Sequence, residues 1–154
     1  AIASTRRPLS SRTCSRSPLR AEANAVAPGK RPLSSMSPTI VMKDDVPVLT
    51  LGGAGGPKII TEVLQAIVRF IDGGQPIDQC VGDPRLHHQW RPDRLFVEQS
   101  FDTDVVRQLR KRGHTVEFLK SGGVAQAISR RSNGDLAGVS DPRVPGKAAS
   151  WFAD

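Results

Sequence analysis

The chain has 154 residues, enough for one domain of ordinary size, with 38% hydrophobic but only 5% aromatic residues. So lean a composition favours a core completed by a partner, or a chain that is partly unfolded. The formal net charge of +7 would permit binding to nucleic acid or to an anionic membrane surface only if the charge formed a patch. No run of about 18 apolar residues occurs, so no membrane span is predicted. Cys14 and Cys80 are too few for a disulfide framework or a zinc site.

The first twenty residues differ from the rest in composition. They contain five arginines, five serines and no acidic residue, and they show almost no apolar periodicity. This composition is typical of an organelle transit peptide, and it also fits a disordered leader or a non-native start. No hydrophobic region marks a secretory signal. We therefore assign residues 1–21 to a disordered, transit-like or non-native leader, and residues 22–154 to the folded part.

From residue 36 onward the pattern is that of a mixed α/β unit. The runs 37–43 and 46–52 are rich in β-formers and are separated by Asp44-Asp45, which predicts a hairpin. Residues 57–74 follow, with Pro57 suited to the first turn of a helix and Gly73-Gly74 to its end. Helical spacing there joins a set of apolar residues, namely Ile60, Val63, Leu64, Ile67, Val68 and Ile71.

The second half is predicted to contain shorter elements. They are a helix over 77–81, a strand over 95–98, a helix over 102–113, and strands over 114–119, 124–131 and 135–141. Asn133-Gly134 is a type I′ turn signal between the last two strands. Because strands and helices do not alternate strictly, the order predicts an α+β or layered sandwich fold rather than a doubly wound nucleotide-binding fold.

The glycine-rich loop Gly52-Gly53-Ala54-Gly55-Gly56 lies between a predicted strand and the long predicted helix. Free backbone amides and the helix dipole stabilise negative charge at such a place. The loop lacks the lysine and spacing of a P-loop and does not fit GxGxxG, so an oxyanion hole is favoured over a phosphate site. A turn that uses glycine only for its backbone angles is the alternative.

Two other groups of residues could indicate a function, namely a histidine pair and several basic residues. The neighbours His87 and His88 could suggest a metal site, but adjacent side chains tend to point apart and no third ligand stands at a recognised spacing, so packing is the preferred interpretation. No metal and no cofactor are predicted. The basic residues Lys111, Arg112 and Arg130-Arg131 are interpreted as solvated faces, since few aromatic residues are available for base stacking.

Four stretches together carry a resemblance to a known family. They are PLSSMSPTIV with the downstream GGAGGPKIITEVLQ, then GDPRLHHQW, then GVSDPR. In this order and spacing the chain from about residue 22 to its end resembles the C-terminal part of the small subunit of gamma-glutamyltranspeptidase, also called glutathione hydrolase. The resemblance implies a partial αββα sandwich of the N-terminal-nucleophile hydrolase type.

The resemblance also implies roles for four residues. Ser34 and Ser35 would bind the α-carboxylate of the gamma-glutamyl donor, and Gly55 and Gly56 would form the oxyanion hole. The pentapeptide RPLSS occurs at 7–11 as well, but there no MSP and no glycine loop follow, so the second copy is the expected site. The chain departs from many members at Gly53-Ala54, where they have Ser-Pro, and at Pro57-Lys58, where they have Ser-Arg.

The reaction implied by the resemblance is hydrolysis of glutathione, or transfer of its gamma-glutamyl group to an acceptor amino acid or peptide, through a threonine acyl-enzyme. Thr5, Thr13 and Thr39 do not stand in the context of that nucleophile. We therefore expect the chain alone to be inactive and to need the large subunit of the same precursor. Family members are usually periplasmic, secreted or at the cell surface. The alternatives are a non-catalytic remnant that binds a partner, and a basic nucleic-acid-binding protein.

Overall fold

The computed structural model describes residues 25–31 and 34–149. The chain divides into two units, Ala1–Ser34 and Ser35–Asp154. In the first unit the described residues form a turn, in which Lys30 N–H donates to the Ala27 carbonyl. The predicted leader, residues 1–21, lies outside the described residues. The second unit holds the helices and strands discussed below.

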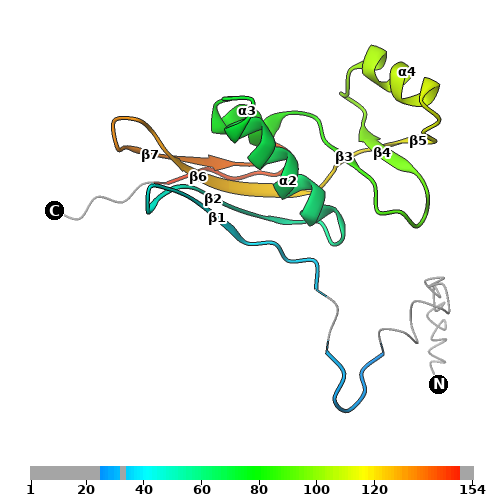
Figure 1. Ribbon diagram of the computed structural model, residues 1–154, viewed down its shortest axis with the longest axis horizontal. Coiled ribbons are helices and arrows are strands. Elements are labelled where there is room, and N and C mark those ends of the chain that lie inside the picture. Colours follow the sequence, from blue (N-terminus) through cyan, green and yellow to red (C-terminus); the bar gives the residue numbers. More distant parts are fainter. Residues whose placement is uncertain (1–24, 32–33, 150–154) are drawn as a thin grey trace, which may run out of the picture. The chain divides into compact units, whose positions relative to one another are not determined.

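Within the described residues, the larger sheet has four strands in the order β1-β2-β6-β7 (Figure 1). All neighbouring strands of this sheet are antiparallel. The bounds are β1 Thr39–Lys43, β2 Val46–Ala54, β6 Val124–Arg130 and β7 Leu136–Ser140. The predicted strands 37–43, 46–52, 124–131 and 135–141 are therefore confirmed, with ends shifted by one or two residues.

The type I′ geometry that the sequence predicts for the second tight turn of this sheet is found at the first one instead. Asp44 and Asp45 both have positive φ, 49° and 62°, which is the backbone of a type I′ turn. At the second hairpin only Gly134 has positive φ, at 93°, and its N–H donates to the Arg131 carbonyl. The type I′ prediction for Asn133-Gly134 is wrong, because the loop there is one residue longer and uses glycine alone for the left-handed position.

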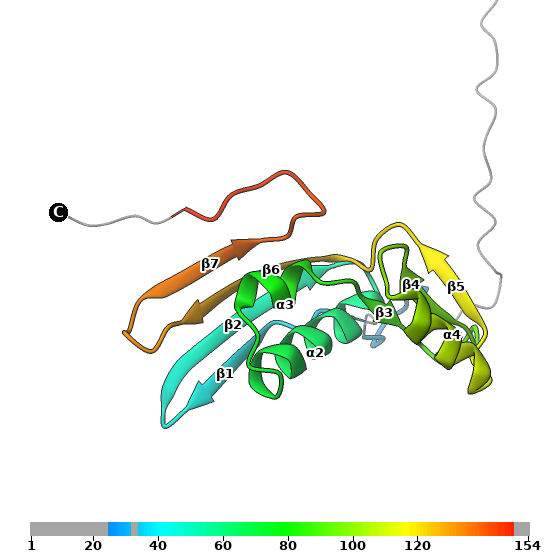
Figure 2. The ribbon, with the colours of Figure 1, turned by 90° about the horizontal axis from the view of Figure 1, so that it is seen from above.

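Helices α2 (Lys58–Ile71) and α3 (Ile77–Gly82) lie over one face of this sheet (Figure 2). They begin and end close to the predicted residues. Apolar side chains of β2, β6 and both helices form the main core: Leu49, Leu51, Ile59, Val63, Ala66, Ile77, Cys80, Val81, Ala125 and Ala127. Burying this apolar surface is the main favourable contribution to packing the helices on the sheet.

A smaller sheet, with three strands among the described residues, has the order β3-β4-β5. Its strands are β3 Leu86–His87, β4 Leu95–Glu98 and β5 Val116–Leu119. Helix α4 (Thr103–Lys111) connects the parallel strands β4 and β5. Asp102 caps this helix by accepting from the N–H groups of Asp104 and Val105. The sequence predicts these elements except β3, whose two residues are too few for a pattern.

Two surfaces of the second unit carry exposed apolar side chains in the described residues. Ile40, Thr50 and Ile128 lie side by side across three strands on the sheet face away from α2, and Ile40 and Ile128 are exposed. On α2 an exposed stripe consists of Ile60, Leu64, Val68 and Ile71. No helix in the described part of the chain is long and apolar enough to span a membrane.

Candidate functional site

The glycine loop joins β2 directly to α2. Gly55 and Gly56 follow the last strand residue, and Pro57 stands at the helix N-cap, where no side chain caps the helix. Gly56 has φ 62°, a conformation that glycine adopts without strain. Among the described residues, no hydrogen bond from the Gly55 or Gly56 N–H is found. The loop therefore presents two amides at the positive end of a helix of 14 residues.

A second glycine pair, Gly122-Gly123, packs against this loop. A β-carbon on Gly55 would stand 3.1 Å from Gly123 Cα, so the two backbones meet at a distance that leaves no room for side chains. The Lys58 ammonium donates to the Ser121 carbonyl at 3.1 Å. This contact ties the first residue of α2 to the segment before β6.

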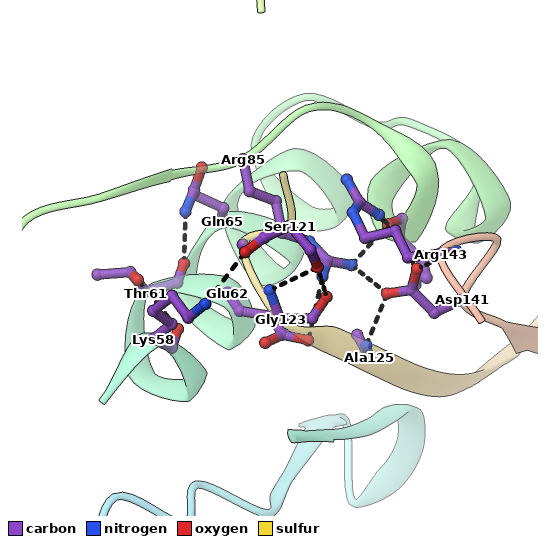
Figure 3. Close-up of polar contacts among 12 residues, drawn as sticks. Lys58, Thr61, Glu62, Gln65, Arg85, Ser121, Gly123, Ala125, Asp141 and Arg143 are labelled. Carbon is purple, nitrogen blue, oxygen red and sulfur yellow. Dashed lines mark hydrogen bonds and ion pairs between the residues drawn. The ribbon is translucent and has the colours of Figure 1, made fainter. Parts of the chain in front are cut away.

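A buried network of charges (Figure 3) lies next to the loop, since a β-carbon on Gly55 would stand 3.7 Å from Glu62 Oε2. The Arg85 guanidinium donates to Glu62 Oε1 at 3.2 Å and to Asp141 Oδ2 at 2.7 Å. Arg143 donates through Nε to Glu98 Oε1 at 2.8 Å and through Nη1 to Asp141 Oδ1 at 3.2 Å. All five side chains are largely or wholly removed from solvent. They connect α2, β4 and the segment after β7.

The three carboxyl groups of this network differ in their partners. Burial acts to raise the pKa of Asp141, but hydrogen bonds from the N–H groups of Ala125 and Arg143 and from Arg85 hold it below its usual value. Burial also acts to raise the pKa of Glu98. Hydrogen bonds to its carboxylate, the largest from the Arg143 side chain, outweigh this effect, so the pKa of Glu98 is lowered too. Burial raises the pKa of Glu62 to about 7, since Arg85 compensates only in part.

The two serines lie at the boundary between the units. Ser34 is exposed and is the last residue of the first unit, whereas Ser35 is half-buried and begins the second. The Ser35 carbonyl accepts a hydrogen bond from the Ser37 hydroxyl at 3.2 Å. Within the second unit, no hydrogen bond joins Ser35 to Gly55 or Gly56 in the described residues. The structure thus brings the two glycines together, and the roles predicted for the serines stay predictions.

The histidine pair is engaged in local contacts. His87 is buried, and its ring nitrogens lie 2.8 Å from Thr61 Oγ1 and 3.0 Å from Gln89 Oε1. His88 contacts Asp93. No group of three potential metal ligands occurs among the residues that the structure describes. The four basic residues predicted to lie on solvated faces are all exposed: Lys111, Arg112, Arg130 and Arg131.

Sequence reasoning did not identify the buried charge network, although a signal for it exists. The tripeptide Asp-Pro-Arg occurs twice, at 83–85 and at 141–143. Arg85 of the first copy binds Asp141 of the second, and Arg143 donates to the carbonyls of Gly82 and Asp83. The repeat therefore marks two segments that bind each other across 56 residues of chain.

We expect Arg85→Leu to destabilise the 154-residue chain by about 3–5 kcal/mol, because it leaves buried carboxylates without their cation. The measurement is urea unfolding followed by circular dichroism. Arg107→Leu is the matched control, since its pair with Asp104 is exposed and such pairs contribute about 0–1 kcal/mol. A loss below about 1 kcal/mol in Arg85→Leu would show that the network does not hold the fold together.

Comparison with solved structures defines the class of protein. The crystal structure of cephalosporin acylase from Bacillus halodurans, an N-terminal-nucleophile hydrolase, matches with a TM-score of 0.69 and 27% identity, covering 75% of this chain and 22% of that chain. The T380A mutant of Helicobacter pylori gamma-glutamyltranspeptidase matches with a TM-score of 0.73 and 42% identity, covering 80% of this chain and 68% of that one. The mixed α/β unit thus matches N-terminal-nucleophile hydrolase structures.

Comparison of sequences defines the family. The family model described as gamma-glutamyltranspeptidase matches residues 8–151, and the chain belongs to this family. The glutathione hydrolase proenzyme of Escherichia coli K12 is 48% identical over 122 residues, which are 79% of this chain and 21% of that protein. The chain thus spans about a fifth of the length of this curated relative. The matched range begins inside the predicted leader 1–21, whose boundary stays a prediction.

Proposed function

We propose that residues 22–154 are the C-terminal part of the small subunit of a gamma-glutamyltranspeptidase. The reaction is hydrolysis of glutathione or another gamma-glutamyl donor, or transfer of the gamma-glutamyl group to an amino acid or peptide. The threonine hydroxyl supplied by the rest of the protein attacks the gamma-glutamyl carbonyl, the amine leaves, and water or an acceptor amine then attacks the acyl-enzyme. No cofactor takes part.

The geometry of the glycine loop carries this proposal. Attack on the carbonyl produces a negatively charged oxygen, and two backbone N–H groups without protein partners, at the start of a helix, can stabilise it. Among the described residues, Gly55 and Gly56 provide such N–H groups. The close packing of Gly55 on Gly123 keeps the loop in place before substrate binds, which lowers the reorganisation needed in the transition state.

Ser34 and Ser35 bind the donor α-carboxylate in this proposal. Ser35 is half-buried at the start of the segment that leads into β1, and Pro38 follows three residues later. A hydroxyl in a segment restrained by proline loses little freedom when it binds an anion. Hydrogen bonds to a charged acceptor are stronger than those to a neutral one. Ser34 and Ser35 together therefore determine which gamma-glutamyl substrates bind.

The large subunit of the same precursor is the proposed partner. The sheet face that carries Ile40 and Ile128 is exposed, whereas α2 and α3 cover the other face. A sheet with one covered and one exposed apolar face is what remains when half of a layered αββα sandwich is taken alone. In the complete protein a second sheet then packs on this face.

The 154-residue chain on its own should release no product from a gamma-glutamyl anilide above the uncatalysed background. The reason is that the proposed residues stabilise charge and bind donor but do not supply a nucleophile. Release of the anilide that persists through repeated purification would contradict this expectation.

Grafting tests the proposal itself. Residues 22–154 replace the matching segment of the Escherichia coli glutathione hydrolase proenzyme, which gives a chimera with the nucleophile and the large subunit of the relative. We expect the matured chimera to hydrolyse the anilide with a kcat within about tenfold of the parent enzyme, a difference of about 1.4 kcal/mol in barrier. A folded and matured chimera without turnover would refute the proposal.

A further inference from the structure

Glu62 is a buried carboxyl group in the first turns of α2, directly behind the glycine loop. Its relative exposure is 1%. Oε1 accepts from Arg85, but Oε2 has no hydrogen-bond partner among the described residues. A buried charged oxygen without a donor is costly, whereas a protonated one can itself donate. Oε1 is therefore suited to accept a hydrogen bond, and Oε2 is suited to carry a proton.

The charges in the network agree with a proton on Glu62. In the described residues, the network holds two guanidinium groups, Arg85 and Arg143, against three carboxyl groups. Asp141 and Glu98 each accept hydrogen bonds from backbone N–H groups as well as from arginine. These two carboxylates balance the two cations, which leaves Glu62 as the group that is most stable when neutral. Burial raises its pKa to about 7.

Other charged groups around Glu62 do not remove the need for a proton. Arg85 lies before β3, Asp141 and Arg143 follow β7, and Lys58 belongs to the same helix. The Lys58 ammonium donates to the Ser121 carbonyl, and Asp141 repels a charge on Glu62. None of these cations has a hydrogen bond to Oε2 in the described residues.

Oε2 faces the backbone that positions the loop. A β-carbon on Gly123 would overlap Oε2 and would stand 3.2 Å from the Ala54 carbonyl oxygen. A β-carbon on Gly53 would stand 2.8 Å from Oε1 and 3.0 Å from the Val124 carbonyl oxygen. Both glycines thus leave room for the carboxyl group, and backbone carbonyls at the ends of β2 and β6 border the same space.

We propose that Glu62 is protonated on the acid side of neutrality and acts as a positioning residue for the glycine loop, keeping the space beneath the oxyanion site uncharged. The inference rests on the proposed function of that loop. In the neutral form the Oε2 hydroxyl lies in the space that the Ala54 and Val124 carbonyls border. When the proton is lost to solvent, a negative charge without a donor appears beneath the place where the oxyanion develops, and the two charges repel.

The test compares the chimera with its Glu62→Gln variant, in which the amide stays neutral at all pH values. Between about pH 6 and pH 8.5 we expect kcat of the Glu62 chimera to fall by about threefold to tenfold relative to Glu62→Gln, with donor KM little changed. Glu117→Gln is the control, because Glu117 is a half-buried residue of β5 that pairs with Arg94 outside the buried network. Its profile should follow the unchanged chimera.

Stability supplies a readout that does not depend on catalysis. A carboxyl group whose pKa is raised on folding contributes stability that is present at low pH and declines as pH rises from about 4.5 to about 7. The apparent Tm of the chimera should therefore fall relative to Glu62→Gln over this range. A constant difference in Tm would show that Glu62 is ionised throughout and would overturn the inference.

The outcomes separate the two proposals. A pH-dependent difference in Tm without a difference in the kcat profiles, in an active chimera, would leave the proposed function standing and overturn the positioning role. An inactive chimera would refute the proposed function and the positioning role with it, while the Tm comparison would still decide whether Glu62 holds the proton. Differences in both profiles support the inference.

Discussion

Changing Ser34 and Ser35 together to alanine in the chimera should raise KM for the gamma-glutamyl donor by about 10²- to 10⁴-fold. Each serine is proposed to donate a hydrogen bond to the donor carboxylate, and a hydrogen bond to a charged group contributes about 1.5–3 kcal/mol. Since this carboxylate is remote from the scissile bond, part of the loss can also fall on kcat through poorer positioning. Steady-state kinetics with a gamma-glutamyl anilide measures both parameters.

The first RPLSS copy supplies the matched control. Ser10 and Ser11 have the same local sequence but lie in the predicted leader, outside the described residues. With residues 1–21 restored ahead of the graft, Ser10→Ala/Ser11→Ala should leave KM and kcat unchanged. An equal rise in KM from the two double variants would show that the second copy has no special role.

Gly56→Pro should lower kcat of the chimera by about 10²- to 10³-fold, the usual effect of removing one donor from an oxyanion hole. Proline deletes the Gly56 N–H, and it also cannot adopt the φ of 62° found there. Donor KM should change less than kcat, because the N–H acts on charge that develops in the transition state.

Gly56→Ala separates the lost donor from the strained backbone. Alanine keeps the N–H, and its β-carbon would meet no atom within 4 Å, so the positive φ is its only cost, about 1 kcal/mol. We expect it to reduce kcat by less than about tenfold. If alanine reduces kcat as much as proline does, loop distortion rather than the missing amide explains the loss.

The sequence predicts most elements of the fold because their signals are local. Asp44-Asp45 between two β-rich runs predicts the first hairpin, and Pro57 and Gly73-Gly74 bracket α2. The pairing of β2 with β6 joins residues at least 70 positions apart, and no local pattern encodes such a partner. Similarly, α2 has more apolar residues than one face can bury, so periodicity alone does not separate buried Val63 from exposed Leu64.

The part of the candidate site that the sequence predicts is the glycine loop, because its glycines mark free backbone N–H groups before a helix. A glycine loop before a helix favours anion binding, and in the structure Gly55 and Gly56 lie directly before α2. Glu62 gives no such signal, since a glutamate in a helix is ordinarily exposed. Only the approach of Arg85 from a distant segment makes its burial possible.

The most direct test of the site is a crystal structure of the chimera holding a gamma-glutamyl acyl-enzyme. We predict that the acyl carbonyl oxygen lies about 2.7–3.1 Å from the Gly55 and Gly56 nitrogens, and that the donor α-carboxylate accepts hydrogen bonds from the Ser34 and Ser35 hydroxyls. An acyl oxygen that points away from the glycine loop, or a carboxylate bound without either serine, would contradict the assignment.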